Sequence, residues 1–173
     1  MESLYAGLAP SVAAYLRLQG AEDPDDLTNE VFLGVFRGLG RFVGGEREWR
    51  SWVLAIAHRR MVDERRRRSR RIATVGMSWS QGGNSLLREP TSPGAEDLAF
   101  DDLASARLRQ CCDRLAPDQR DVVLLRLVAD LSVEQVASAL GKSQGAVKAL
   151  QRRGLEALRR ELGATFSPEG VTL

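Results

Sequence analysis

The sequence has few of the residues on which enzyme and metal sites depend. Its 173 residues contain one histidine, His58, and two cysteines, Cys111 and Cys112. A single histidine in an arginine-rich segment completes no Ser-His-Asp set, and adjacent sulfurs without a nearby histidine form neither a zinc site nor an ordinary disulfide. No phosphate-binding glycine loop is present. We therefore expect a protein that is not an enzyme and uses no metal and no cofactor.

The two cysteines lie in a stretch with helical spacing, together with Leu108 and Leu115. Free cysteine behaves as a small buried hydrophobic residue, so we expect both to pack in the core. A redox role is the alternative.

Long hydrophobic runs are also lacking. No apolar stretch approaches the ~20 residues that cross a bilayer, and Met1 to Tyr5 has none of the charge or hydrophobicity of a secretory signal. We therefore expect a cytoplasmic protein without a membrane partner. Its apolar content of 43% is ordinary for a globular fold.

The net charge is only +2, but the basic residues are concentrated in two places. Between Arg59 and Arg71 there are eight arginines against Asp63 and Glu64. A second cluster extends over 142–160 and holds Lys142, Lys148, Arg152, Arg153, Arg159 and Arg160. One such run is usually a solvated face. Two runs on predicted helices favour contact with a polyanion such as nucleic acid.

The chain lacks strand-like alternation, and its composition changes once. Over about 76–99, glycine, serine and proline interrupt any regular spacing of apolar residues, which is typical of a flexible linker. The predicted fold class is therefore all-α, with two small helical domains at 1–75 and 100–173.

In the first domain, Pro10 is expected to end one short helix and begin another. Asp23 and Pro24 form an N-cap pair that begins a further helix. Its predicted inward stripe consists of Leu27, Val31, Phe32, Val35, Phe36 and Leu39. A longer helix is expected from about Glu46.

The outer face of the helix that begins at Pro24 carries Asp26, Asn29, Glu30 and Leu33. A solvated surface explains the polar residues. An exposed leucine among carboxylates instead favours contact with another protein.

The segment from Val133 to Leu150 has the pattern of a helix-turn-helix. Ala137 is small enough for a close helix crossing, and Gly141 suits a turn with positive φ. Val147 and Leu150 would pack the second helix onto the first. Its exposed face carries Gln144, Lys148, Gln151 and Arg152, whose donors suit base edges and phosphates. The second domain is therefore predicted to bind DNA.

Three segments of the chain resemble known regions of one family. Asp26 to Phe32 and Trp49 to Asp63 are similar to region two of bacterial sigma factors, and Leu115 to Leu158 is similar to region four. The passage from region two directly to region four resembles the extracytoplasmic-function (ECF) group. The resemblance covers about 1–75 and 100–163.

The resemblance implies a sigma factor that binds core RNA polymerase and directs promoter recognition and transcription initiation. Asp26, Asn29, Glu30 and Leu33 would contact the clamp coiled coil of polymerase. The loop from Phe42 to Glu48 would hold a base flipped from the minus-ten element. The residues implied to face that melted strand are His58, Arg59, Arg60, Arg65, Arg66 and Arg67. Those implied to contact the duplex minus-thirty-five element are Ser143, Gln144, Lys148, Gln151, Arg152 and Arg153.

The implied partners are core RNA polymerase and promoter DNA, both as duplex and as melted strand, and many relatives also bind an anti-sigma factor. Three positions depart from the common pattern. Asn29 replaces a usual glutamine, Arg59 replaces a frequent asparagine, and Gly154 interrupts the last helix at a cost of about 1 kcal/mol unless packing requires it.

A second class of protein is the alternative. In a two-domain regulator, the C-terminal helix-turn-helix would bind duplex DNA and the first domain would sense a signal. The arginine-rich helix and the Trp49/Trp52 motif argue against this alternative.

Overall fold

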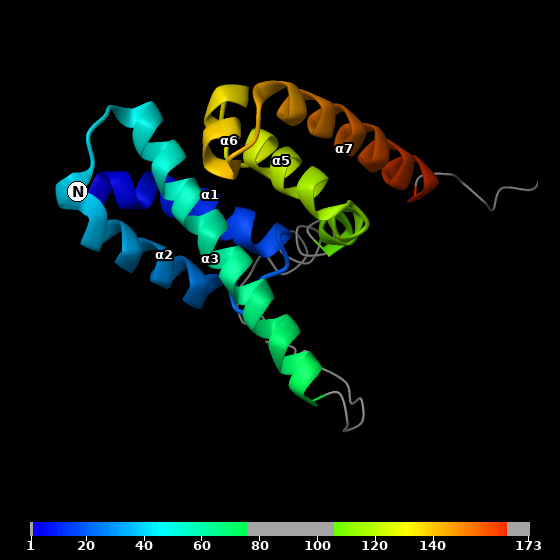
Figure 1. Cartoon of the computed structure of the whole chain (residues 1–173), viewed down its shortest axis with the longest axis horizontal. Helices are drawn as coiled ribbons and strands as arrows, with labels where there is room; N and C mark the ends of the chain where they lie inside the picture. Colours follow the sequence, from blue (N-terminus) through cyan, green and yellow to red (C-terminus); the bar gives the residue numbers. More distant parts are fainter. Residues whose placement is uncertain (1, 76–105, 166–173) are drawn as a thin grey trace, which may run out of the picture.

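The computed structural model describes residues 2–75 and 106–165, and within these ranges the chain forms helices and no strand (Figure 1). The N-terminal part, residues 2–75, consists of α1 (Glu2–Leu18), α2 (Pro24–Gly38), the 3-10 turn η1 (Leu39–Arg41) and α3 (Glu46–Val75). The C-terminal part, residues 106–165, has a helical segment at 106–113 and then α5 (Pro117–Leu127), α6 (Val133–Leu140) and α7 (Gln144–Thr165). The all-α prediction is confirmed. The predicted linker, 76–99, lies outside the described residues.

Helices α1, α2 and α3 pack against one another around a core to which α1 contributes Val12 and Leu16, α2 contributes Val31, and α3 contributes Val53 and Leu54. The predicted inward stripe is confirmed except at Phe36. Phe36 is 51% exposed, whereas Phe32 is buried. Val35 is buried and Leu39 packs against the core, so Phe36 lies at the edge of the inward stripe and joins the outer face.

The start of α2 is formed as predicted. Asp23 accepts hydrogen bonds from the backbone nitrogens of Asp25 and Asp26, and Pro24 occupies the first helical position. These contacts satisfy backbone N–H groups of the first turn, which have no hydrogen-bond partner within the helix.

The prediction of a helix break at Pro10 is wrong, because α1 continues through it from Glu2 to Leu18. Pro10 lies on the exposed side of α1, while Leu8 and Val12 on either side of it are buried. The packing of both halves onto one core outweighs the hydrogen bond that proline removes.

In the C-terminal part, α6 and α7 form the predicted helix-turn-helix. Ser132 and Gln135 make a reciprocal capping box at the start of α6. Gly141 ends that helix with φ 63°, in the left-handed region that glycine enters at little cost. Ala137 and Val147 are buried between the helices.

Gly154 is required by packing. A Cβ at this position would be 2.6 Å from Cγ2 of Val123 and 3.4 Å from Cβ of Gln119, so α5 and α7 approach each other too closely for a side chain. Among the other expected core residues, Cys111 and Cys112 are buried as unpaired thiols, whereas Leu108 is 41% exposed.

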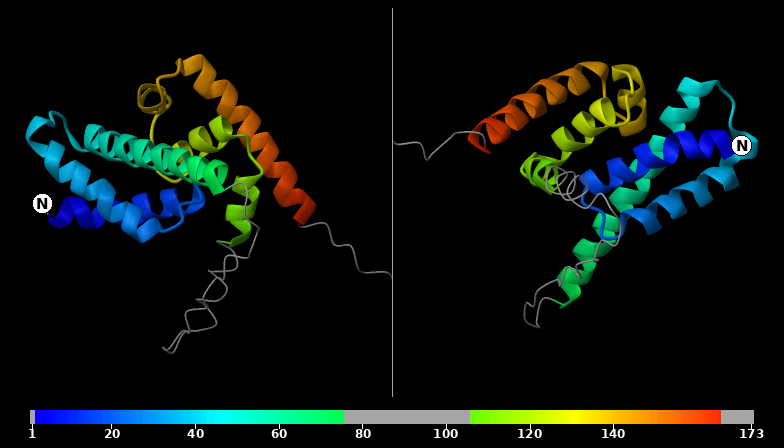
Figure 2. Two further views of the ribbon diagram at one scale, coloured as in Figure 1. Left: turned by 60° about the horizontal axis from the view of Figure 1, so that its bottom comes forward. Right: turned by 180° about the vertical axis from the view of Figure 1, so that it is seen from behind.

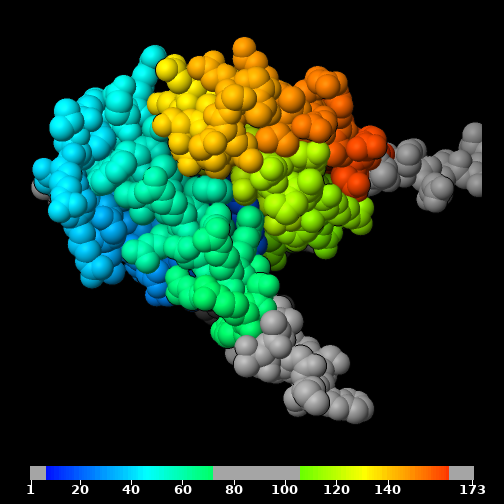
Figure 3. Space-filling view, viewed as in Figure 1, coloured from blue at the N-terminus to red at the C-terminus, as the bar shows by residue number. Residues whose placement is uncertain are grey.

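The two parts of the chain are in contact. Helix α5 packs beside the end of α1, and α6 packs against the first half of α3 (Figures 2 and 3). On this boundary the Gln135 Nε2 donates to the Arg47 carbonyl at 3.0 Å. No helix within the described ranges combines the length and apolarity needed to span a bilayer.

Candidate polymerase and nucleic-acid interfaces

The outer face of α2 combines acidic, amide and apolar groups. Asp26 and Asn29 are exposed, and Leu33 is 54% exposed beside the equally open Phe36. Glu30 is less available for contact with another protein, because its carboxylate lies 3.6 Å from the Arg60 guanidinium on α3. The four residues predicted for protein contact therefore share one surface, which Phe36 extends.

The loop between η1 and α3 is flanked by a cluster of three aromatic side chains. The rings of Phe42, Trp49 and Trp52 lie 5.2–5.6 Å apart between centroids. The Glu48 carboxylate accepts a hydrogen bond from the Gly45 nitrogen at 2.9 Å and so fixes the start of α3. Val43 is 92% exposed at the tip, a feature that the sequence pattern did not single out. Phe42 and Glu48 thus organise the loop, and Val43 is its outermost apolar group.

The arginines of α3 divide between solvent and the interior of the molecule. Arg59, Arg66 and Arg67 are exposed, as expected for residues that face nucleic acid. Arg65 instead turns toward the C-terminal part, with its side chain only 25% exposed, and His58 turns the same way.

The predicted DNA-contacting face of α7 lies open. Ser143 accepts a hydrogen bond from the Ala146 nitrogen at 3.2 Å and caps the helix. Gln144 and Lys148 are exposed and make no side-chain hydrogen bond or ion pair within the described part of the chain. Such groups are available to base edges at the end of a helix that enters a major groove.

Farther along α7, the exposed donors are partly engaged. Arg152 pairs with Glu156 at 3.4 Å, and Arg153 donates to the Ala149 carbonyl at 3.3 Å. Gln151 is half-buried, and its Oε1 accepts from Arg126 at 3.4 Å. Exposed ion pairs and helix-surface contacts of this kind contribute little and exchange readily for phosphate.

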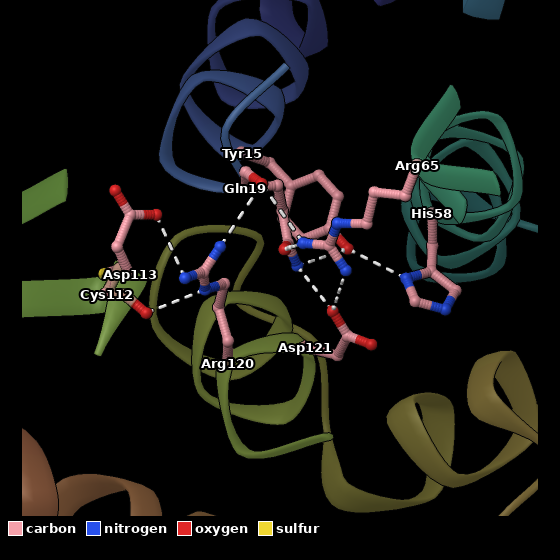
Figure 4. Close-up of polar contacts among 8 residues, drawn as sticks. All are labelled: Tyr15, Gln19, His58, Arg65, Cys112, Asp113, Arg120 and Asp121. Carbon is pink, nitrogen blue, oxygen red and sulfur yellow. Dashed lines mark hydrogen bonds and ion pairs between the residues drawn. The ribbon is translucent and has the colours of Figure 1, made fainter. Parts of the chain in front are cut away.

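Sequence reasoning missed a buried polar network centred on Gln19, which is 1% exposed (Figure 4). The Gln19 Nε2 donates to the Tyr15 hydroxyl at 3.0 Å and to Asp121 Oδ1 at 2.9 Å. Arg65 donates to the Gln19 side-chain and backbone oxygens, and its Nη1 lies 3.5 Å from Asp121 Oδ1. Three elements far apart in sequence, α1, α3 and α5, thus meet at one amide.

Arg120 extends this network into the C-terminal part. Its Nε donates to the Cys112 carbonyl at 2.7 Å, and its Nη2 lies 3.0 Å from Asp113 Oδ1. Its Nη1 also reaches the Gln19 carbonyl at 3.5 Å. The backbone oxygen of Gln19 therefore accepts from arginines of both parts.

The protonation states at Tyr15 and His58 follow from burial. Burial raises the pKa of the Tyr15 hydroxyl, so it keeps its proton. Burial also lowers the pKa of His58, an effect that Arg65 strengthens and Asp121 opposes. Since Tyr15 accepts from Gln19, its own hydrogen is free to point to His58 Nδ1, 3.0 Å away. A neutral His58 with its hydrogen on Nε2 can accept that hydrogen at Nδ1.

No sequence signal marked this network. Gln19 and Asp121 are 102 positions apart, and a glutamine at a helix end or an aspartate in the second turn of a helix is ordinary. The one available hint is that Asp121 directly precedes the buried run from Val122 to Leu125.

Comparison with known proteins agrees with the helical arrangement. Residues 4–71 match the model of sigma-70 region 2, and residues 105–158 match that of sigma-70 region 4. The chain is 34% identical over 148 residues to the ECF RNA polymerase sigma factor BldN of Streptomyces coelicolor, with 86% of this chain and 54% of BldN covered. It is 32% identical over 139 residues to SigK of Mycolicibacterium vanbaalenii, with 80% and 68% covered.

Among solved structures, the chain resembles the sigma factor RpoE of Bartonella quintana in complex with the anti-sigma factor NepR. The TM-score is 0.71 at 16% identity, with 94% of this chain and 96% of RpoE covered. At that identity the likeness establishes the fold alone.

Two region models in the expected order, on a two-part helical fold, define a sigma-70-type transcription protein. The chain belongs to the ECF group of RNA polymerase sigma factors. It spans about half the length of BldN and two thirds of SigK. Membership of this family confirms the prediction that it is not an enzyme.

Proposed function

We propose that this chain binds core RNA polymerase and directs it to promoters by contacting both the minus-ten and the minus-thirty-five element. The observation that carries the proposal is the open face of α7, where Gln144 and Lys148 project from a complete helix-turn-helix. A protein that only sensed a signal through its first part would not need the exposed arginines of α3 as well.

The proposed polymerase contact is the outer face of α2. Asp26, Asn29, Glu30 and Leu33 lie together there, and Phe36 adds apolar area next to Leu33. Carboxylates around an apolar centre fit a partner surface that is basic at its rim and apolar in its middle.

The proposed minus-ten contacts come from the loop and from α3. Phe42 and Glu48 support the loop, while Val43 at its tip is open to a flipped base. Arg59, Arg66 and Arg67 would contact phosphates of the melted strand, with Arg60 beside them. His58 and Arg65 join this surface only when the C-terminal part moves away.

The proposed minus-thirty-five contacts come from α7. Ser143, Gln144 and Lys148 form the end that enters the groove, and Gln151, Arg152 and Arg153 follow along the helix. Phosphate contacts would position this helix and base contacts would give it specificity.

An anti-sigma factor is a further proposed partner, which the complex of RpoE with NepR supports. Because core polymerase works in the cytoplasm, we also propose a cytoplasmic location.

Assembly with polymerase is the direct test. The full chain is mixed with core polymerase, and the complex is separated by size exclusion and assayed for run-off transcription from a promoter library. We expect one chain per polymerase and transcription from a restricted set of promoters. A chain that binds promoter duplex alone and never joins polymerase would instead be a two-domain regulator.

A further inference from the structure

Ser69 places a hydroxyl inside the basic run of α3. Arg66 to Arg68 come directly before it, and Arg70 and Arg71 come directly after it. Its side chain is exposed, and its hydroxyl makes no hydrogen bond within the part of the chain that the structure describes. The proposed promoter contacts use arginines near Ser69 and leave the serine itself without a role.

The part of α3 that carries Ser69 is not anchored in the core. Among the α3 side chains that the structure describes, Met61 is the last that is buried. Beyond it the helix extends away from the other helices, as Figure 1 shows for the end of α3. Polar contacts to the turn between α1 and α2 hold it there. Arg68 reaches a backbone carbonyl of that turn at 3.4 Å, and Arg71 pairs with the exposed Glu22 at 3.0 Å. Such contacts contribute little, so this end of the helix opens locally at low cost.

The charge pattern before Ser69 suits a protein kinase with an acidic substrate groove. Arginines directly before a serine pair with carboxylates of such a groove, and this pairing selects the serine to be modified. The segment must also leave the helix so that the hydroxyl can enter the active site, which the local opening permits. Ser138 on α6 is equally exposed, but no arginine or lysine lies between Arg126 and Ser138. Exposure alone therefore does not provide the pattern.

A phosphate on Ser69 changes the surface that the proposed function assigns to DNA. It carries a charge of about −1.5 to −2 at neutral pH. Arg66 is exposed and lies three residues earlier, so its guanidinium and the phosphate lie on the same face of the helix. Phosphate oxygens accept from a guanidinium in the same two-bond geometry whether the phosphate belongs to a serine or to DNA. The modification thus occupies Arg66 and also repels the strand.

We propose that Ser69 is a phosphorylation site through which a protein kinase with an acidic substrate groove weakens promoter binding. In the transfer, the Ser69 Oγ bonds to the γ-phosphorus of ATP, the bond between that phosphorus and the β–γ bridging oxygen breaks, and ADP leaves. The hydroxyl proton passes to a base of the kinase. This inference rests on the proposed function, because its effect requires that the arginines of α3 bind DNA.

The first experiment measures whether the folded chain accepts the phosphate. The full chain is incubated with MgATP and the catalytic subunit of protein kinase A, whose substrate groove is acidic, and the modified residues are mapped by mass spectrometry. We expect phosphate at Ser69 in the wild type and at the same rate in Ser138→Ala. Changing Arg66 and Arg67 to Gln should slow the transfer about tenfold or more, since two charge pairs with the kinase are lost. A folded chain that gains no phosphate at Ser69 overturns the site.

The second experiment measures the effect of the phosphate on DNA binding. Phosphoserine is installed during translation at position 69, and at position 138 as a control with the same added charge on α6. The affinity for a fluorescein-labelled single-stranded DNA of mixed sequence is measured by anisotropy at several salt concentrations. Circular dichroism verifies that both modified chains keep their helices.

We expect the phosphate at Ser69 to cancel two arginine charges. The slope of log affinity against log salt should then decrease by about 1.4, and binding should weaken on the order of tenfold at about 0.1 M salt. The chain modified at Ser138 should bind as the unmodified chain does. Removal of the phosphate from Ser69 by a phosphatase should restore the affinity.

Arg66→Gln separates pairing with Arg66 from a general effect of charge or of helix fraying. In this background the phosphate at Ser69 should weaken DNA binding several-fold less than in the wild type, because the guanidinium with which it pairs is absent. An equal loss in the two backgrounds means that Arg66 is not the partner of the phosphate, which overturns this mechanism.

The outcomes distinguish this proposal from the proposed function. If the chain with phosphate at Ser69 binds DNA as tightly as the unmodified chain, the regulatory role is wrong and the sigma function is untouched. If the unmodified chain binds neither DNA nor core polymerase, the proposed function is wrong, and so is the effect assigned to the phosphate. Transfer of phosphate to Ser69 is measured without DNA and is decided independently of that result.

Discussion

Gly154 on α7 lies directly against Val123 on α5, so closely that a Cβ at position 154 would be 2.6 Å from the valine Cγ2. The helix that carries the proposed DNA-contacting face, α7, is therefore held against α5 at a separation that only glycine permits.

Gly154→Ala tests this close approach. Alanine favours a helix over glycine by about 1 kcal/mol, but overpacking costs about 1–3 kcal/mol, so we expect net destabilisation. Urea unfolding followed by circular dichroism measures the change. In a double-mutant cycle, Val123→Ala should cost less in the Gly154→Ala background than in the wild type. A Gly154→Ala variant that is more stable than the wild type would show that α5 and α7 can move apart.

The second prediction concerns pH and His58. Burial holds the pKa of His58 below its ordinary value of 6.5, so the folded chain resists protonation there. Above pH 6.5 the histidine is neutral in both the folded and the unfolded chain, and it contributes no pH dependence. Below that pH the unfolded chain takes up a proton that the folded chain does not, and the free energy of unfolding falls.

His58→Gln provides the comparison, because its amide oxygen can still accept the Tyr15 hydroxyl hydrogen and does not titrate. Urea unfolding between pH 7.5 and 5.5 should show a steeper loss of stability for the wild type than for His58→Gln. Parallel curves for the two proteins would mean that His58 titrates normally in the folded chain.

The third prediction concerns the outer face of α2. Asp26→Lys should weaken assembly with core polymerase by at least tenfold, since a reversed charge at an interface costs several kcal/mol. Asp25→Lys is the control, because Asp25 is also exposed in the first turn of α2 but points about 100° away around the helix. Both changes oppose the helix dipole equally. Equal assembly of the two variants in a size-exclusion assay would move the polymerase contact elsewhere.

The fourth prediction separates base recognition from phosphate binding on α7. Lys148 is exposed near the start of the helix and has no ion-pair partner among the residues that the structure describes, whereas Arg153 is exposed more than a turn farther along. Lys148→Ala should change which minus-thirty-five sequences are preferred, by about 1–3 kcal/mol at one or two base pairs. Arg153→Ala should lower affinity for all sequences alike.

Transcription of one promoter library by the wild type and both variants, with the same core polymerase, measures this difference. If Arg153→Ala reorders the promoters and Lys148→Ala does not, α7 lies in the groove in a different rotation. No effect from either change would mean that α7 does not contact promoter DNA.

The sequence by itself determined the features that depend on neighbouring residues. The N-cap at Asp23, the capping box from Ser132 to Gln135 and the positive φ at Gly141 are local, because each requires only a few residues in order. The same holds for the helix-turn-helix as a whole, since its apolar spacing and its turn lie within one short segment. For this reason the fold class and the open face of α7 could be predicted without coordinates.

Only the tertiary structure decided the features that depend on distant contacts. Pro10 remains inside α1 because both of its neighbouring turns pack on one core. Phe36 is exposed although Val35 before it is buried and Leu39 after it packs against the core, so its place at the edge of the stripe decides its exposure. Arg65 belongs to the same basic run as Arg66, yet it faces Asp121 while Arg66 faces solvent. Charge and periodicity are alike for the two arginines, and the difference arises from a carboxylate 56 positions away that only folding brings near.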